Sequence, residues 1–276
     1  MNEKQVNIGK ISYINDAPVY FGLDHGLLPP WLKMVSDVPA VLNDQIKTGQ
    51  IKISPVSAAF YAMNHRKLLL LPDLSISCNG RVMSVILASN YSIDDLGGKK
   101  VIFSRESASA AAFLKMIFRR KKVSPIFEVG STNDYQKIAR RVDAALIIGD
   151  AALLHPWGQI FKYCMDLGRL WYDMTKLPFV FAVWVVRRSF AARHPSLVRE
   201  IHKLLLASKE LGYQNIDKVI ETGQNKLGLK RSVIKEYFDL LYCDLDDEKI
   251  NAMALFFDSL FDQGILNKRV NIEFFH

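Results

Sequence analysis

The chain has 276 residues, of which 50% are apolar and 23% are charged, and this composition is typical of a globular protein that forms one large domain or two smaller ones. No apolar run follows a basic start at the amino terminus, and no apolar stretch reaches the roughly 18 residues of a membrane span. These patterns predict a cytoplasmic protein without a membrane partner.

The formal net charge of +8 does not by itself indicate a nucleic-acid partner, because the basic residues are dispersed along the chain. The densest run, RRKK at 119–122, precedes Pro125 and is expected to end a helix, where cations complement the helix dipole. A positive excess also steers small anions, which favours an anionic substrate. Cys78, Cys164 and Cys243 lie far apart without CxxC spacing and are expected to be reduced thiols.

The first two thirds of the chain alternates short apolar runs with helical patterns, which predicts βα units and a parallel sheet with right-handed crossovers. The first strand is expected at 6–11 and runs into a polar turn at Asn15 and Asp16, before a helix that Pro18 suits. Residues at the carboxyl edge of an open α/β sheet meet ligands there. The same residues suit a helix cap, and both interpretations stay open at this point.

The remaining elements follow the same alternation. Further strands are expected at 32–35, 51–56, 68–71, 82–88, 100–103, 126–129, 144–148 and 179–186. Helices are expected at 38–49 between an Asp37 N-cap and a Gly49 stop, from Ser57 onward, at 109–118 and at 134–141, and the pattern is helical from 195 to 264.

Two such α/β cycles, separated by the turn-rich stretch SIDDLGG at 92–98, predict two lobes. The first lobe is discontinuous and comprises residues 1–88 plus 187–276, and the second comprises 89–186. The crossover strands are expected near 82–89 and 179–186, with a ligand cleft between the lobes. Hinge closure around a ligand is the motion that this arrangement permits.

Common catalytic and metal-binding motifs are absent from the sequence, and the six histidines show no metal-ligand spacing. No metal or cofactor is therefore expected. Small hydroxyl and amide side chains follow strands or begin helices instead, where exposed N–H groups complete a carboxylate site. Each of them alone is more often a cap, but their common sheet edge favours a ligand site. They are Asn15, Ser57, Ser84, Ser107 and Ser109, with Asp150 as a further substrate-binding candidate.

Several longer stretches resemble the two-lobed, periplasmic-binding-protein-like (type II) enzymes of menaquinone synthesis by the futalosine route, and among them the chorismate dehydratases. The resemblance covers roughly residues 6–188, in order and at family spacing. The matching stretches are IGKISYINDAP at 8–18, DVPAVLN at 37–43, SPVS at 54–57, LLPDLSIS at 70–77, Gly80, Ser84 with Val85, DAALIIGD at 143–150 and LPFVFAVW at 177–184.

The resemblance implies an α/β fold with mixed sheets flanked by helices, and a lyase that dehydrates chorismate, a dianion, to 3-[(1-carboxyvinyl)oxy]benzoate. Asn15 and Ser84 fall at the key active-site positions of the family. They are expected to hold the substrate and polarise its departing hydroxyl. No histidine or lysine presents itself as a base. The resemblance implies the substrate's own side-chain carboxylate as a proton acceptor, and the identity of the acceptor is left open. Oligomeric state is left open.

One departure concerns the helix start in the second lobe, where the family has a Ser-Arg-Thr-Ser-like pattern and this chain has SASA at 107–110. Ala108 and Ala110 supply no donor, whereas Arg105 could compensate. A non-catalytic or altered-substrate anion-binding paralogue is therefore the alternative. The sister activity, 1,4-dihydroxy-6-naphthoate synthesis, ranks lower because Gly149 and Asp150 stand where that enzyme places a histidine and a glutamate.

Overall fold

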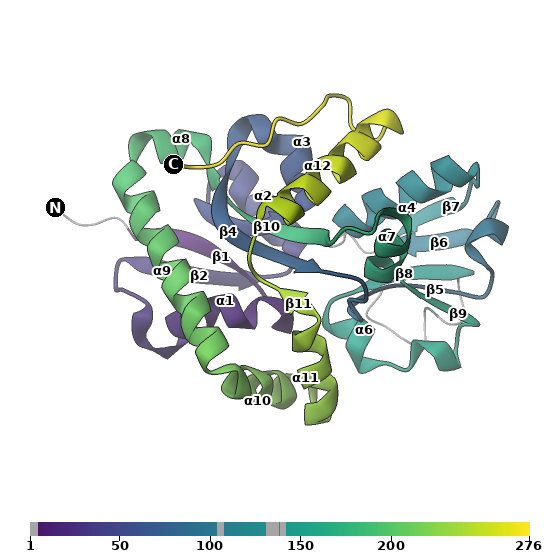
Figure 1. Ribbon diagram of the computed structural model, residues 1–276, viewed down its shortest axis with the longest axis horizontal. Coiled ribbons are helices and arrows are strands. Elements are labelled where there is room, and N and C mark those ends of the chain that lie inside the picture. Colours follow the sequence, from purple (N-terminus) through teal and green to yellow (C-terminus); the bar gives the residue numbers. More distant parts are fainter. Residues whose placement is uncertain (1–4, 104–107, 131–137, 139–141) are drawn as a thin grey trace.

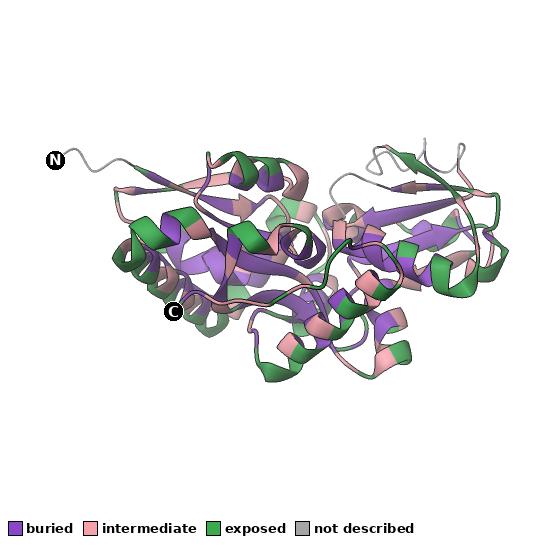
Figure 2. Ribbon diagram, turned by 90° about the horizontal axis from the view of Figure 1, so that it is seen from above, coloured by how far each residue is buried: buried purple, intermediate pink, exposed green. Residues whose placement is uncertain are grey.

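The computed structural model describes residues 5–103, 108–130, 138 and 142–276. The chain forms two mixed β-sheets with flanking helices, and the sheets lie side by side in two halves of the molecule (Figure 1). The C-terminus lies on the side of the larger sheet (Figure 1). Strands of both sheets are mostly buried, while the outer helix faces are exposed (Figure 2). This is the predicted α/β architecture of two mixed sheets.

The larger sheet has six strands in the order β11-β4-β10-β3-β1-β2. β1 is parallel to β2 and β3, as predicted for successive βα units, but β10 lies antiparallel between β3 and β4. The sheet is mixed because the chain leaves it after β4 and returns through β10. Its strands are β1 (Val6–Ile11), β2 (Leu32–Asp37), β3 (Ile53–Ser57), β4 (Leu68–Cys78), β10 (Phe179–Arg187) and β11 (Leu241–Tyr242).

The smaller sheet has five strands in the order β7-β6-β8-β5-β9. Its strand β5, which lies between β8 and β9, alternates between two cores: Val85 and Leu87 join the main core, while Ile86 and Ala88 face a smaller cluster. This alternation is the two-residue period of a strand buried on both faces. The strands are β5 (Val85–Ser89), β6 (Lys100–Phe103), β7 (Ile126–Val129), β8 (Ala144–Ile148) and β9 (Tyr163–Asp166).

Helices cover the sheets from both sides. α1, α9 and α10 pack on one another, whereas α2, α3 and α12 contact the strands β1, β3 and β10 of the larger sheet (Figure 1). No helix among the described residues is long and apolar enough to cross a membrane. The helices are α1 (Ala17–Gly22), α2 (Pro39–Thr48), α3 (Ala58–Asn64), α4 (Ala108–Lys121), α6 (Asp150–Leu154), α7 (Leu167–Thr175), α8 (Arg188–Arg193), α9 (Pro195–Gln214), α10 (Ile216–Leu227), α11 (Arg231–Asp239) and α12 (Asp247–Asp262).

Several predicted boundaries differ from the observed ones. The strand expected at 82–88 begins only at Val85, and the stretch expected to be helical from 195 to 264 is interrupted by the short strand β11. The N-cap of α2 is Val38 rather than Asp37, whose Oδ1 accepts from the Val38 N–H at 2.8 Å. β4 extends well past the predicted 68–71 because the strand passes through an irregularity at Asp73, which has φ +56, and then resumes pairing with β10. The C-cap Gly49 is left-handed at φ +85, as the helix-stop signal predicts. The helix predicted at 134–141 falls mostly outside the described residues.

The chain crosses between the sheets twice, after β4 and before β10. β5 pairs only in the smaller sheet and β10 only in the larger one among the described strands. The exact division into lobes at 88/89 and 186/187 stays a prediction.

An aromatic cluster joins the two halves. Phe113 of α4, Trp171 of α7, Phe179 of β10 and Phe256 of α12 are all buried. The ring centroids lie 5.6 Å apart for Phe113 and Trp171, and 4.9 Å apart for Phe179 and Phe256. Such pairs contribute about 0.5–1.5 kcal/mol each beyond area burial. The cluster is thus a continuous apolar contact between the two sheets.

Candidate functional site

A cleft lies where residues of the two sheets and their helix starts meet. The larger sheet contributes Tyr13, Asn15, Ser57 and Phe181, and the other half contributes Ser84, Ala108, Ser109, Ala110 and Gly149. The cleft is narrow: its cavity volume is about 70 Å³, within about 580 Å³ of unfilled space that includes the open mouth.

Asn15 lies on a short 3-10 turn, Ile14–Asp16, between β1 and α1. Its Oδ1 is buried and has no hydrogen-bond partner among the described residues. Buried polar atoms in native proteins are almost always paired, so an unpaired amide oxygen at a cleft points to a ligand that completes it. The cap interpretation fails for Asn15, because no side-chain cap hydrogen bond is made at the start of α1.

Ser84 precedes β5 at the other wall of the cleft and is 4% exposed. Its backbone is fixed on both sides: its N–H donates to the Val82 carbonyl, and its carbonyl accepts from the Gly149 N–H, each at 2.8 Å. Its Oγ accepts a hydrogen bond from the Tyr237 hydroxyl at 3.0 Å. The structure therefore brings Asn15 and Ser84 to the same cleft.

Ser57 lines the cleft but is also the N-cap of α3, where its side chain accepts from the Phe60 N–H at 3.2 Å. Such a cap contributes about 1 kcal/mol to stability. Ser57 thus has the predicted cap role. Its hydroxyl hydrogen can still be donated in a hydrogen bond to a ligand in the cleft.

Ser109 of α4 uses its hydroxyl twice within the protein. Its Oγ accepts from the Ala59 N–H and donates to the Phe181 carbonyl, both at 3.0 Å. Ala59 and Phe181 belong to α3 and β10 on the larger sheet. In this conformation Ser109 therefore ties the two halves together and has no free hydrogen for a ligand.

Asp150 lies behind the wall of the cleft rather than on its surface. Its Oδ1 accepts from the Ile14 N–H at 3.0 Å, and its Oδ2 forms an ion pair with Lys226 of α10 at 2.9 Å. Gly149, just before it, adopts φ +63, and a Cβ there would lie 2.7 Å from the Tyr13 ring. Arg105 and Ser107 fall outside the described residues, so their predicted roles stay predictions.

Asp16, next to Asn15, is fully buried. Burial raises the pKa of its carboxyl to about 8, against the attraction of the Lys10 ammonium. Its Oδ2 accepts from the Ile11 N–H at 2.7 Å, and its Oδ1 has no partner among the described residues. This neutral acid holds the end of β1 against the turn that carries Asn15.

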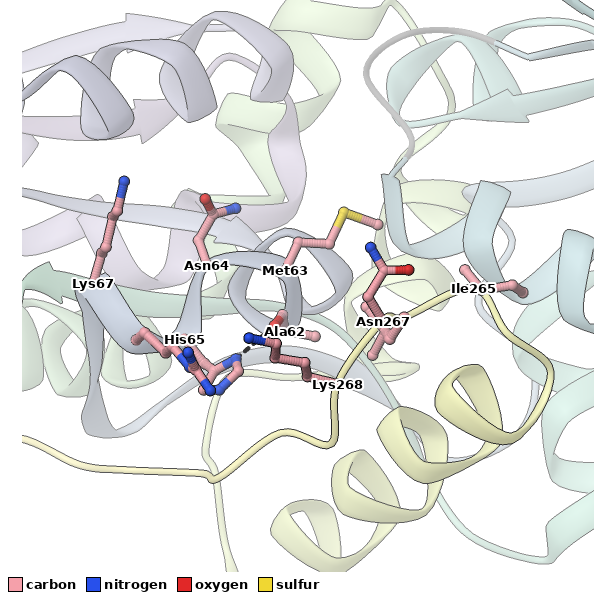
Figure 3. A pocket seen from close by; sticks show the side chains of 10 residues that line it. Ala62, Met63, Asn64, His65, Lys67, Ile265, Asn267 and Lys268 are labelled. Atoms are coloured by element: carbon pink, nitrogen blue, oxygen red, sulfur yellow. Dashed lines mark hydrogen bonds between the residues drawn. The ribbon is translucent and has the colours of Figure 1, made fainter.

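A second hollow of about 510 Å³ lies between the end of α3 and the segment 265–268 (Figure 3). Arg66, Lys67 and Lys268 line it and are exposed. His65 Nδ1 lies 2.8 Å from the Ala62 carbonyl (Figure 3). Its cations reach into solvent, unlike the buried polar atoms of the cleft. No group of His, Cys, Asp and Glu side chains suited to a metal ion occurs among the described residues.

Tyr237 and the contact between Tyr13 and Gly149 were not predicted as parts of the site. Tyr237 falls in a helix whose pattern is amphipathic, so its sequence signal is that of a core residue. The glycine at 149 is the only local hint of a close backbone approach at that wall.

Comparisons with known proteins agree with this geometry. The chain matches the family described as menaquinone biosynthesis over residues 6–262. It is 30% identical over 247 residues to a chorismate dehydratase of Thermus thermophilus, covering 83% of this chain and 86% of the relative. It is also 30% identical over 178 residues to a chorismate dehydratase of Campylobacter jejuni, covering 63% of this chain and 64% of that relative.

Solved structures share the fold. Protein AF1704 from Archaeoglobus fulgidus has a TM-score of 0.75 and 18% identity, covering 96% of this chain and 100% of that chain. The alkanesulfonate-binding protein SsuA from Xanthomonas axonopodis pv. citri, bound to MOPS, has a TM-score of 0.70 and 16% identity, with 97% and 96% covered. The fold is thus periplasmic-binding-protein-like. Within that class, the chain belongs to the menaquinone biosynthesis family.

Proposed function

We propose that this protein is a chorismate dehydratase, a lyase that removes water from chorismate to give 3-[(1-carboxyvinyl)oxy]benzoate. The observation that carries the proposal is the composition of the cleft. Asn15 offers a buried, unpaired amide oxygen and Ser84 a hydroxyl, and no lysine, histidine, aspartate or glutamate is among the described lining residues. Such a neutral polar cleft suits a reaction in which the protein supplies orientation rather than a base.

The reaction breaks the ring carbon–oxygen bond of the hydroxyl and the carbon–hydrogen bond beside it, and the electron pair of the latter completes the aromatic ring. Aromatisation provides the driving force, so the protein has to align the groups and exclude water. The enolpyruvyl carboxylate of the substrate accepts the ring proton and passes it to the departing hydroxyl, which leaves as water. Asn15 and Ser84 bind the substrate and polarise the departing hydroxyl in this proposal.

A second candidate is a non-catalytic or altered-substrate binder of small anions. Ala108 and Ala110 line the cleft with methyl groups. The Ser109 hydroxyl is already hydrogen-bonded to the Ala59 N–H and the Phe181 carbonyl. These features weaken the grip on a second carboxylate. Arg105 is proposed to supply that grip. The cytoplasmic location stays a prediction.

The test is to incubate purified protein with chorismate, follow the ultraviolet change on aromatisation and identify the product by chromatography and mass spectrometry. We expect a product 18 mass units lighter than chorismate. Thermal stabilisation by chorismate without any product supports the binder instead. Prephenate as the main product contradicts dehydration, because prephenate forms by rearrangement without loss of water and therefore keeps the mass of chorismate.

A further inference from the structure

Tyr237 is a buried tyrosine whose hydroxyl the proposed mechanism has not yet used. It lies on α11, 153 residues from Ser84 in sequence, and is 1% exposed. Its hydroxyl lies 3.0 Å from Ser84 Oγ, yet Tyr237 is not among the described residues that line the cleft. Tyr237 thus reaches the site only through Ser84.

The surroundings of Tyr237 keep its hydroxyl protonated. Burial raises its pKa well above the ordinary value, and the negative charge of Asp150 raises it further, while the hydrogen bond to Ser84 acts in the opposite direction. At neutral pH this phenol is therefore a hydrogen-bond donor. Ser84 Oγ is its acceptor in this structure.

The direction of this hydrogen bond has a consequence for Ser84. A serine hydroxyl carries one hydrogen and two lone pairs. When one lone pair accepts from Tyr237, the serine's own hydrogen must point elsewhere, and no acceptor for it is found in the described part of the chain. The backbone of Ser84 is held by hydrogen bonds to Val82 and Gly149, so only rotation about the side-chain bonds remains to decide where this hydrogen points.

We propose that Tyr237 is a positioning residue: by donating to Ser84 Oγ, it holds the serine as a hydrogen-bond donor directed into the cleft. This inference rests on the proposed function, in which Ser84 polarises the departing hydroxyl of chorismate. Without the tyrosine donor, Ser84 is free to rotate and its hydrogen is no longer aimed at the leaving group.

The test compares Tyr237→Phe with the wild type by steady-state kinetics on chorismate. The variant keeps the ring and loses only the hydroxyl. We expect kcat to fall about tenfold, the effect of a neutral hydrogen bond, while KM changes less than about twofold. Tyr237→Phe added to Ser84→Ala should have no further effect on kcat, because the tyrosine acts through the serine.

Tyr61→Phe is the matched control. Tyr61 is also buried and makes one hydrogen bond through its hydroxyl, which accepts from the Glu273 N–H at 3.1 Å. Tyr61 does not line the cleft, so the kcat of Tyr61→Phe should equal that of the wild type even if the variant has a lower melting temperature. A merely structural effect of losing a buried hydroxyl would appear in both variants.

The outcomes separate this inference from the proposed function. An active wild type with an unchanged kcat in Tyr237→Phe, or with additive effects of Tyr237→Phe and Ser84→Ala, overturns the role of Tyr237 alone. A wild type that does not convert chorismate overturns the proposed function and the role of Tyr237 with it. A fall in kcat that vanishes in the Ser84→Ala background supports both.

Discussion

The Asp150 carboxylate accepts a hydrogen bond from the Ile14 N–H at 3.0 Å, although 136 residues separate the two in sequence. Ile14 begins the turn that carries Asn15, and Asp150 begins α6 behind the smaller sheet. Lys226 holds the other oxygen of Asp150 at 2.9 Å. One half of the molecule thus fixes the turn that presents Asn15 from the other half.

Asp150→Ala should therefore loosen the Asn15 turn. The Ile14 N–H loses its acceptor and Lys226 loses an ion-pair partner, so we expect the free energy of unfolding to fall by about 1–3 kcal/mol. Turnover of chorismate should fall more than its binding, because the reacting groups lose alignment. Asp173→Asn, which removes an exposed ion pair with Arg169, is the control. An Asp150→Ala enzyme with normal kcat would show that the turn does not need this contact.

Ser109→Ala tests the tie between the halves. The change leaves the Ala59 N–H and the Phe181 carbonyl without their partner, and the expected loss of stability is about 1–3 kcal/mol. Small-angle X-ray scattering of the ligand-free protein should show a larger radius of gyration, since the closed form loses two hydrogen bonds. Ser232→Ala on an exposed helix face should change neither quantity. Equal scattering curves for Ser109→Ala and the wild type would contradict the idea that the two Ser109 hydrogen bonds hold the halves together.

Much of the fold follows from local pattern, but much of the site does not. The strand and turn up to Asn15, the Ser57 cap and the Gly49 helix stop were all predictable, because each depends on residues close in sequence. The bonds that Ser109 makes to residues 50 and 72 positions away depend on how the halves pack. Sequence alone suggested a carboxylate ligand for Ser109, whereas the observed partners are the protein's own backbone.

The same limit applies to Tyr237 and to β10. Tyr237 reaches Ser84 only because α11 packs near the crossover to β5, a contact across 153 residues. The alternation of strands and helices predicted a parallel sheet, and nothing local in 179–186 revealed that this strand enters antiparallel between β3 and β4. Long-range pairing is set by the whole topology and not by the strand's own residues.

Asp16→Asn should change how stability depends on pH. The folded state holds the Asp16 proton up to a pKa of about 8, whereas the unfolded chain releases it near the ordinary aspartate value. Between about pH 4 and 8, the wild type therefore loses stability as pH rises, by up to about 1.4 kcal/mol per pH unit. Asparagine cannot ionise, so the variant should lack this pH-dependent loss. Its free energy of unfolding should therefore rise relative to that of the wild type as pH rises.

The measurement for Asp16 is urea unfolding of both proteins at pH 5, 6, 7 and 8. Asp217→Asn, at a side chain that is 83% exposed, serves as the control, and its curve should run parallel to that of the wild type. A constant difference between Asp16→Asn and the wild type across this range would contradict a buried, neutral Asp16.

Gly149→Ala should damage the cleft wall. The residue has φ +63 and ψ −145, a conformation that only glycine adopts readily, and the added Cβ would meet the Tyr13 ring at 2.7 Å. We expect a loss of stability of about 2 kcal/mol or more and a loss of chorismate turnover. Gly158→Ala, where nothing lies within 4 Å of the added Cβ, is the matched control. Normal turnover in Gly149→Ala would mean that the Tyr13 contact is dispensable.

The central claim is that Asn15, in a cleft whose described lining residues include no protein base, drives the dehydration of chorismate. The most direct measurement follows chorismate loss and 3-[(1-carboxyvinyl)oxy]benzoate formation for the wild type and Asn15→Ala side by side, with chorismate binding measured by calorimetry. We predict product from the wild type, and from Asn15→Ala a turnover reduced at least a hundredfold, as when one preorganised hydrogen-bonding group of an active site is removed, with binding still detectable. Equal turnover by the two proteins would contradict the account.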